Sequence, residues 1–133
     1  MQRKRKTVKK DNVIIVIEEP EQNMHPALQS KLADLFYEVW KNKGGKVRFV
    51  VETHSEYLVR RLQVIAAQEI ERGNYTTDEI NDNIKVVYFP VNKDPYPMDF
   101  DDYGYFIRDF DSGFFDEAGR SYRELVRMER GIK

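Results

Sequence analysis

Two glutamates follow a short apolar run near the beginning of the chain. The run is Ile14–Ile17, and Glu18 and Glu19 come directly after it. A carboxylate at the end of a strand can hold Mg²⁺ or one of its waters, because this ion prefers oxygen ligands. Glu19, one residue on and differently directed, could orient and deprotonate a water that attacks a phosphate. A buried strand that meets a solvated turn gives the same residue types, so the pair alone leaves both interpretations open.

The next apolar run, residues 46–52, ends in a polar corner that contains His54. The carboxyl ends of neighbouring parallel strands meet at one edge of a sheet, so we expect His54 to lie near Glu18 and Glu19. An imidazole there can donate a hydrogen bond to a terminal phosphate or to the attacking water. The alternative is a histidine that bonds to the backbone at the start of a helix, and His25 has the same ordinary alternative.

The elements that must position these groups alternate between strand and helix. Apolar residues at spacings of three and four predict a helix with Pro26 in its first turn, and Gly44 ends it. Alternating strands and crossover helices are typical of a parallel sheet. The fold class that we predict is α/β, with a three-layer parallel sheet. The expected order is strand 12–17, helix from Pro26 to Gly44, strand 46–52, helix from Ser55 to Gly73, a capping box at Thr76 and Glu79, and strand 84–89.

The last third of the chain, residues 93–133, is aromatic and acidic. We expect a hairpin turn at residues 102–104 and a final helix that reaches about Arg130. The aromatic side chains could pack this extension on the sheet or form an interface with another protein. The aromatic residues in question are Tyr96, Phe100, Tyr103, Tyr105, Phe106, Phe110, Phe114 and Phe115.

Length and composition exclude several classes of protein. The 133 residues are typical of one domain, and their 22 Lys and Arg nearly balance 23 Asp and Glu. The sequence contains no Cys, which excludes a disulfide scaffold, a thiol nucleophile and a Cys-ligated zinc site. It has no apolar run of the roughly 18 residues that span a bilayer and no signal-peptide pattern. We therefore expect a cytoplasmic protein without a membrane partner.

Basic residues crowd the first ten positions of the chain. Such an arm, residues 1–11, can hold the phosphates of nucleic acid without sequence preference, or it can be a solvated tail. No aromatic residue interleaves it. Nucleic acid therefore stays open as a partner. The basic residues are Arg3, Lys4, Arg5, Lys6, Lys9 and Lys10.

Two segments of the chain together resemble a known family. Residues 13–29 contain Glu18-Glu19-Pro20-Glu21 and His25-Pro26, and residues 50–58 contain Glu52-Thr53-His54-Ser55. They resemble the Walker B, D-loop and switch-histidine segments of predicted AAA-family ATPases with an ABC-type head, in the SMC/RecF-like and OLD-like branch. Residues 113–117, Gly-Phe-Phe-Asp-Glu, resemble the uncharacterised C-terminal domain that follows this head. The resemblance extends from about Asn12 to about Glu117.

The resemblance implies a role for each matching residue. Glu18 takes the Walker B position at Mg²⁺, where Asp is commoner, Glu19 is the catalytic glutamate, and His54 is the switch histidine. The D-loop, which meets a second head, has Met24-His25 where transporter-type members have Leu-Asp. The D-loop residues are Gln22, Asn23, Met24 and His25, and the supporting residues are Glu52, Thr53 and Ser55.

The resemblance also implies Mg²⁺ and ATP as cofactors of the complete head. The sequence contains no Gly-x-x-x-x-Gly-Lys-Ser/Thr phosphate loop, and Gly44-Gly45-Lys46 lies between a helix and a strand, in the reverse order. We therefore expect a C-terminal lobe over residues 12–92, followed by the extension, that does not hydrolyse ATP alone. Its expected partners are the N-terminal lobe and a second head, with DNA defence or repair as the process implied by relatives.

Three other interpretations stay open. A Toprim-like nuclease would use Glu18 or Glu19 with an Asp-x-Asp pair, either residues 99–101 or residues 109–111. A zinc site could combine His25, His54 and a glutamate. A non-catalytic interaction module would pair with another chain through the D-loop and the aromatic extension.

Overall fold

A computed structural model of the chain describes residues 12–111, 114 and 124–129. The chain divides into two units, Met1–Leu62 and Gln63–Lys133, with the boundary inside helix α2 (Glu56–Glu71). The basic arm, most of the 113–117 segment and the residues on either side of 124–129, where the predicted final helix would begin and end, lie outside the described residues. Residues 124–129 are helical. The division of residues 12–133 into a lobe and an extension stays a prediction.

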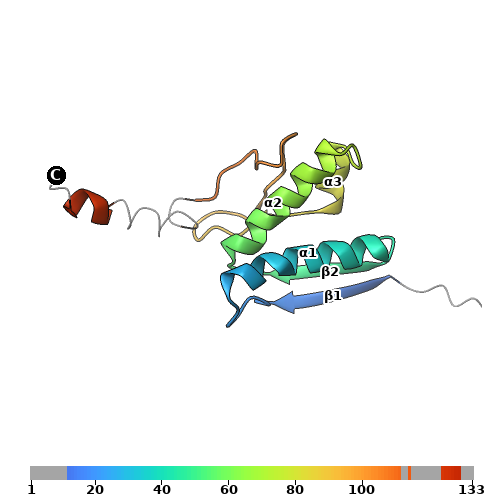
Figure 1. Cartoon of the computed structure of the whole chain (residues 1–133), viewed down its shortest axis with the longest axis horizontal. Helices are drawn as coiled ribbons and strands as arrows, with labels where there is room; N and C mark the ends of the chain where they lie inside the picture. The colour runs from blue at the N-terminus through green and yellow to red at the C-terminus, as the bar shows by residue number, and fades with distance from the viewer. Residues whose placement is uncertain (1–11, 112–113, 115–123, 130–133) are drawn as a thin grey trace, which may run out of the picture. The chain divides into compact units, whose positions relative to one another are not determined.

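The first unit contains two parallel strands joined by a helix. Strand β1 (Val13–Glu18) leads through a turn into helix α1 (Pro26–Asn42), and strand β2 (Val47–Glu52) follows. The strands pair in register from Val13 opposite Val47 to Glu18 opposite Glu52, so both carboxyl ends lie at the same edge (Figure 1). The predicted parallel pairing and the α/β class are confirmed.

Helix α1 begins and ends where the sequence predicts. The His25 imidazole accepts the Ala27 N–H at 3.2 Å. Pro26 occupies the first turn, where its lack of an N–H costs nothing because N–H groups at a helix start have no acceptor within the helix. Gly44 and Gly45 follow the helix with φ of 60° and 77°, which favours glycine. One face of α1 packs against β2 (Figure 1). The Phe36 and Phe49 rings, one from each element, lie 4.9 Å apart.

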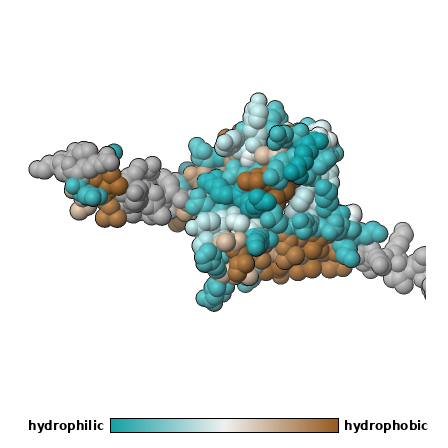
Figure 2. Space-filling model, in the orientation of Figure 1, coloured by the Kyte–Doolittle hydropathy of each residue, from teal (hydrophilic) through white to brown (hydrophobic). Residues whose placement is uncertain are grey.

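Strand β1 is more exposed than its sequence indicates. A continuous β-branched run predicts a strand buried on both faces, but Ile14 is 60% and Val16 69% exposed. Within the described residues the sheet has only two strands, and α1 packs against β2. The prediction of a strand buried on both faces is therefore wrong for these residues. Figure 2 shows the result as a band of hydrophobic surface over β1.

The second unit has its own core. Ala66, Ile80 and Phe100 are completely buried and pack together. Helix α3 (Thr77–Asn83) begins with the predicted capping box, in which Thr76 and Glu79 exchange side-chain to backbone hydrogen bonds of 3.1 and 3.2 Å. No helix within the described residues combines the length and apolar character needed to cross a bilayer.

The predicted third strand of the parallel sheet is wrong. In residues 84–89 only β3 (Val87–Tyr88) is extended in a sheet, and it pairs antiparallel with β4 (Tyr96–Pro97). Part of the apolar run is not free to form a strand, because Ile84 ends α3 and donates its N–H to the Ile80 carbonyl at 2.8 Å. Val87–Tyr88 therefore belongs to a separate small sheet.

The predicted hairpin is present at residues 100–106. Gly104 has φ of 83°, and the Asp101 carboxylate accepts the N–H groups of Tyr103 and Tyr105 at 2.8 and 3.0 Å. Several aromatic residues of this region pack on one another, which supports packing as their role, whereas the rings of Tyr103 and Tyr105 are exposed. Burial, and next the charge of Asp111, raise the pKa of Tyr88 within this cluster. The packed rings are Tyr88, Tyr96, Phe100, Phe106, Phe110 and Phe114.

Candidate functional site

The carboxyl ends of β1 and β2 bring two polar corners side by side. Glu18 lies opposite Glu52 in the strand register, and the Glu19 N–H donates to the Glu52 carbonyl at 2.8 Å. The backbone hydrogen bonds between β1 and β2 thus continue as far as Glu19 and Glu52, where the candidate site begins. Beyond Glu19 the first corner turns away toward α1, and beyond Glu52 the second leads into α2.

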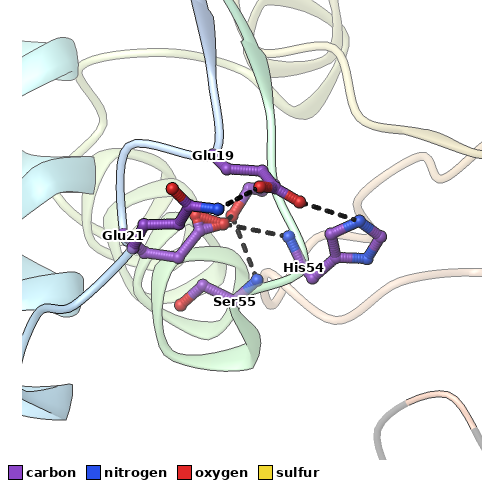
Figure 3. A network of polar contacts seen from close by, with 6 residues as sticks. Glu19, Glu21, His54 and Ser55 are labelled. Atoms are coloured by element: carbon purple, nitrogen blue, oxygen red, sulfur yellow. Dashed lines mark hydrogen bonds and ion pairs between the residues drawn. The ribbon is translucent and has the colours of Figure 1, made fainter.

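Glu19 and His54 face each other across these corners (Figure 3). The Glu19 Oε1 lies 3.6 Å from the His54 Nε2, and the Glu19 Oε2 accepts the Gln22 side-chain N–H at 2.6 Å. The two side chains are 39% and 70% exposed, so both can meet a ligand from solvent. The proximity that parallel strands predict for this pair is what the structure has, whereas the chemical role of each residue stays a prediction.

Glu19 has an unusual backbone conformation. Its φ of 45° lies in the left-handed region, which is sparsely populated by residues other than glycine. Such strain, of order 1–3 kcal/mol, is found most often at functional sites. This conformation ends β1 at Glu18, so Glu19 leaves the regular alternation of side chains along the strand.

Glu18 and Glu52 form a pair of exposed carboxylates at the last register position of the sheet. Neighbours in register on parallel strands project on the same side of a sheet, and like charges in this arrangement repel. A divalent cation would relieve the repulsion. Oxygen donors of this type suit Mg²⁺, which binds through one or two carboxylates together with phosphate and water and needs no all-protein cage.

Glu21 joins the two corners, a role that the sequence did not reveal. Its Oε1 accepts a short hydrogen bond from the Thr53 hydroxyl and a second, of 3.0 Å, from the His54 N–H (Figure 3). Its Oε2 is buried and receives no hydrogen bond from the described residues. The sequence does show a third acid, Glu21, after the first strand and a hydroxyl residue, Thr53, after the second. Whether the two side chains meet depends on how the turn after Glu19 folds, which the sequence pattern does not reveal.

Thr53 and Ser55, which we predicted as supporting residues, form the other side of this network. The Ser55 N–H donates to the Thr53 hydroxyl at 3.0 Å. The buried Ser55 hydroxyl donates to Gln29 Oε1 at 2.6 Å and accepts the Leu58 N–H at 3.1 Å, so it also caps α2 as predicted. The Gln29 amide in turn donates to the Met24 carbonyl at 3.0 Å.

The predicted D-loop residues, 22–25, form the turn between β1 and α1. Gln22 contacts Glu19, as described above, and Asn23 has φ of 61°, a conformation that Asn tolerates well. Met24 is 37% exposed. His25 caps α1 through Nδ1, which is its ordinary alternative role. Contact of this turn with a second head stays a prediction.

The two metal-site alternatives find no support among the described residues. These residues contain no group of three or more His, Cys, Asp or Glu side chains arranged to hold a metal ion. For zinc, the His25 Nδ1 is already used as a helix cap. For the nuclease, Asp101 stabilises its own hairpin turn, and the Asp111 carboxylate lies 3.5 Å from the Lys93 ammonium.

Replacement of Ser55 by Ala is expected to lower the free energy of unfolding by about 1–2 kcal/mol, because α2 loses its cap and Gln29 loses a donor. Urea unfolding followed by circular dichroism measures the loss. Gln29→Ala and the double variant complete a mutant cycle. The two single effects should sum to more than the effect of the double variant, because the residues share one hydrogen bond. Simple additivity would show that this contact contributes nothing.

Comparison with known protein families gives a match that includes this corner. Residues 1–59 match the family model of the AAA ATPase domain. The match includes β1, the turn, α1, β2 and the corner with His54. No curated protein and no solved structure matches the chain. The first unit of the chain is therefore similar to an AAA-type ATPase domain, and it carries Glu19, Glu21 and His54 inside the matched residues.

Proposed function

We propose that the corner formed by Glu18, Glu19 and His54 is the hydrolytic half of an ATPase site. The observation that carries the proposal is the placement of Glu19 opposite His54 at the carboxyl edge of two parallel strands. Ligands of open parallel sheets bind at this edge. The similarity of residues 1–59 to the AAA ATPase domain supports a nucleotide as the ligand.

In this proposal each residue performs a separate task. Glu19 takes the proton from the attacking water, and its hydrogen bond from Gln22 fixes the carboxylate. His54 donates a hydrogen bond to the terminal phosphate from an exposed imidazole. Glu18 holds Mg²⁺ or one of its waters, and Glu52 adds negative charge beside it. The ion, when bound, supplies neutralising charge to the phosphate oxygens.

The half-site depends on a second polypeptide segment for phosphate binding. The sequence contains no glycine-rich phosphate loop of the Walker A type. We propose that a lobe with such a loop completes the head, and that the 22–25 turn meets a second head of the ABC-type, SMC/RecF-like or OLD-like class. Coupling of the cycle to nucleic acid, in defence or repair, belongs to the same proposal.

The exposed apolar surface of β1 supports the proposal that another polypeptide segment packs against this strand. Ile14, Val16 and Val50 are 60%, 69% and 55% exposed. Val16 lies opposite Val50 in the register, and Ile14 is two residues from Val16 on the same face of the strand. Contiguous apolar surface of this kind marks an interaction site. It also favours the second candidate function, an interaction module without catalysis, which shares the surface but makes no use of Glu19.

The experiment that tests the proposal compares three samples: this chain, the polypeptide that carries the phosphate loop, and their mixture. Release of inorganic phosphate from ATP is measured with Mg²⁺ and with EDTA. Mg²⁺-dependent hydrolysis is expected only in the mixture. A complex that forms but does not hydrolyse ATP would instead support the interaction module, and hydrolysis of equal rate by the phosphate-loop polypeptide alone would refute the half-site.

A further inference from the structure

The backbone ladder between the two site corners ends before it reaches His54. The last bond of the ladder is from the Glu19 N–H to the Glu52 carbonyl. His54 lies two residues beyond Glu52, and its imidazole is 70% exposed. A side chain with this exposure is not oriented by packing, so its direction depends on how its backbone is held.

The described contact that holds the backbone of His54 from the other corner is the carboxylate of Glu21. A single oxygen of Glu21 accepts both the His54 N–H, at 3.0 Å, and the hydroxyl of Thr53 (Figure 3). The residues are 32 and 33 positions apart in the sequence. Hydrogen bonds to an ionised acceptor are about twice as strong as neutral ones. Glu21 therefore restrains two consecutive residues of the opposite corner.

These bonds close a ring that includes the turn and both helix starts. The Ser55 N–H donates to Thr53, the Ser55 hydroxyl donates to Gln29, and the Gln29 amide donates to the Met24 carbonyl. The Met24 N–H then returns to the Glu21 carbonyl at 3.0 Å. Connected hydrogen bonds in a partly buried place reinforce one another, so the ring behaves as one unit.

The second oxygen of Glu21 indicates that this carboxylate contributes more to the position of the opposite corner than to the free energy of unfolding. Oε2 is buried without a hydrogen bond from the described residues. Burial of a polar atom without a partner lowers the free energy of unfolding, and much of what Oε1 contributes is offset. An apolar side chain could fill the space, but it would accept neither the His54 N–H nor the Thr53 hydroxyl.

We propose that Glu21 is the positioning residue of the site, which holds the His54 backbone so that the imidazole faces Glu19. The catalytic meaning of this inference rests on the proposed ATPase function, but its geometry does not. Glu21 need not touch ATP or the attacking water. It acts through His54, and the side chain of Thr53 acts with it.

The first test uses the 133-residue chain and backbone amide exchange measured by NMR. In Glu21→Ala we expect the His54 amide to exchange at least about tenfold faster, because its acceptor is gone. The Glu19 amide, which belongs to the strand ladder, should keep its rate and so report an intact sheet. Glu21→Gln keeps an acceptor oxygen and should keep most of the protection. Glu38→Ala, at an exposed glutamate of α1, is the matched control.

The second test uses the ATP-hydrolysing mixture of this chain with its phosphate-loop partner. Glu21→Ala should lower kcat at least about tenfold with little change in KM, because misplacement of a catalytic group impairs the chemical step more than binding. Glu21→Gln should restore most of kcat. Wild-type kcat in Glu21→Ala, in a mixture where Glu19→Gln abolishes hydrolysis, would overturn the catalytic part of the positioning role.

The two tests separate the inference from the proposed function. An unchanged His54 exchange rate in Glu21→Ala would overturn the inference, whatever the hydrolysis shows. If instead His54 loses protection and Glu19→Gln leaves hydrolysis at the wild-type rate, the placement of His54 by Glu21 stands and the proposed function fails. Thr53→Val should give an intermediate exchange rate for His54, since it removes one of the two donors to Glu21.

Discussion

In an ATP-hydrolysing head that contains this chain, Glu19→Gln is expected to lower kcat by about 100-fold or more while ATP still binds. Glutamine keeps the size of the side chain and an oxygen that can accept the Gln22 amide, so the corner keeps its shape. It cannot take a proton from water. The variant should therefore accumulate bound, unhydrolysed ATP, which a single-turnover assay with labelled nucleotide detects.

A matched control separates loss of the base from loss of charge. Glu38→Gln changes the net charge by the same amount at an exposed position of α1. This control should hydrolyse ATP at the wild-type rate. If Glu19→Gln also turns over normally, Glu19 is not the base, and the half-site would have to be assigned to other residues.

Gly104→Ala is expected to lower the free energy of unfolding by about 2–5 kcal/mol. A Cβ at this position would lie 2.6 Å from the Gln63 carbonyl oxygen and 2.7 Å from the Ala67 Cβ, both on α2. The backbone φ of 83° is also unfavourable for alanine. The hairpin would have to move away from the helix, so both strain and lost packing contribute. Urea unfolding followed by circular dichroism gives the change.

Gly73 provides the comparison for the conformational part of this effect. It has φ of 72°, but a Cβ there would meet nothing within 4 Å. Gly73→Ala should therefore lose only about 1 kcal/mol from the left-handed backbone. The difference between the two variants measures how closely the hairpin approaches α2. Equal losses at both glycines would mean that the approach is not tight.

The parallel pair and its corners were predictable because local signals agree with the tertiary structure. A β-branched run, a Pro at a helix start and Gly at its end predict β1, α1 and β2 within a residue or two. Since parallel strands end at the same edge, Glu19 and His54 had to be near each other once that order was accepted. No long-range information was needed for this step.

The rest depends on contacts that no local pattern encodes. The run 84–89 is apolar enough for a sheet strand, but its partner, Tyr96–Pro97, is a two-residue segment with a proline and no strand pattern. Glu21 could not be distinguished from Glu18 and Glu19 by type. Its link to Thr53 and His54 spans more than thirty residues and depends on how the turn after Pro20 folds. Exposure of β1 likewise depends on what else joins the sheet.

The exposed strand β1 also has a consequence for handling of the chain. Val13–Ile17 is a continuous β-branched stretch without proline, glycine or charge, which is the composition of segments that form cross-β fibrils. Charged residues stand on both sides of it, with Lys9, Lys10 and Asp11 before it and two glutamates after it, and such gatekeepers slow strand-to-strand stacking. Their protection is electrostatic and weakens as salt screens it. We therefore expect the uncovered strand to form fibrils faster as the ionic strength rises.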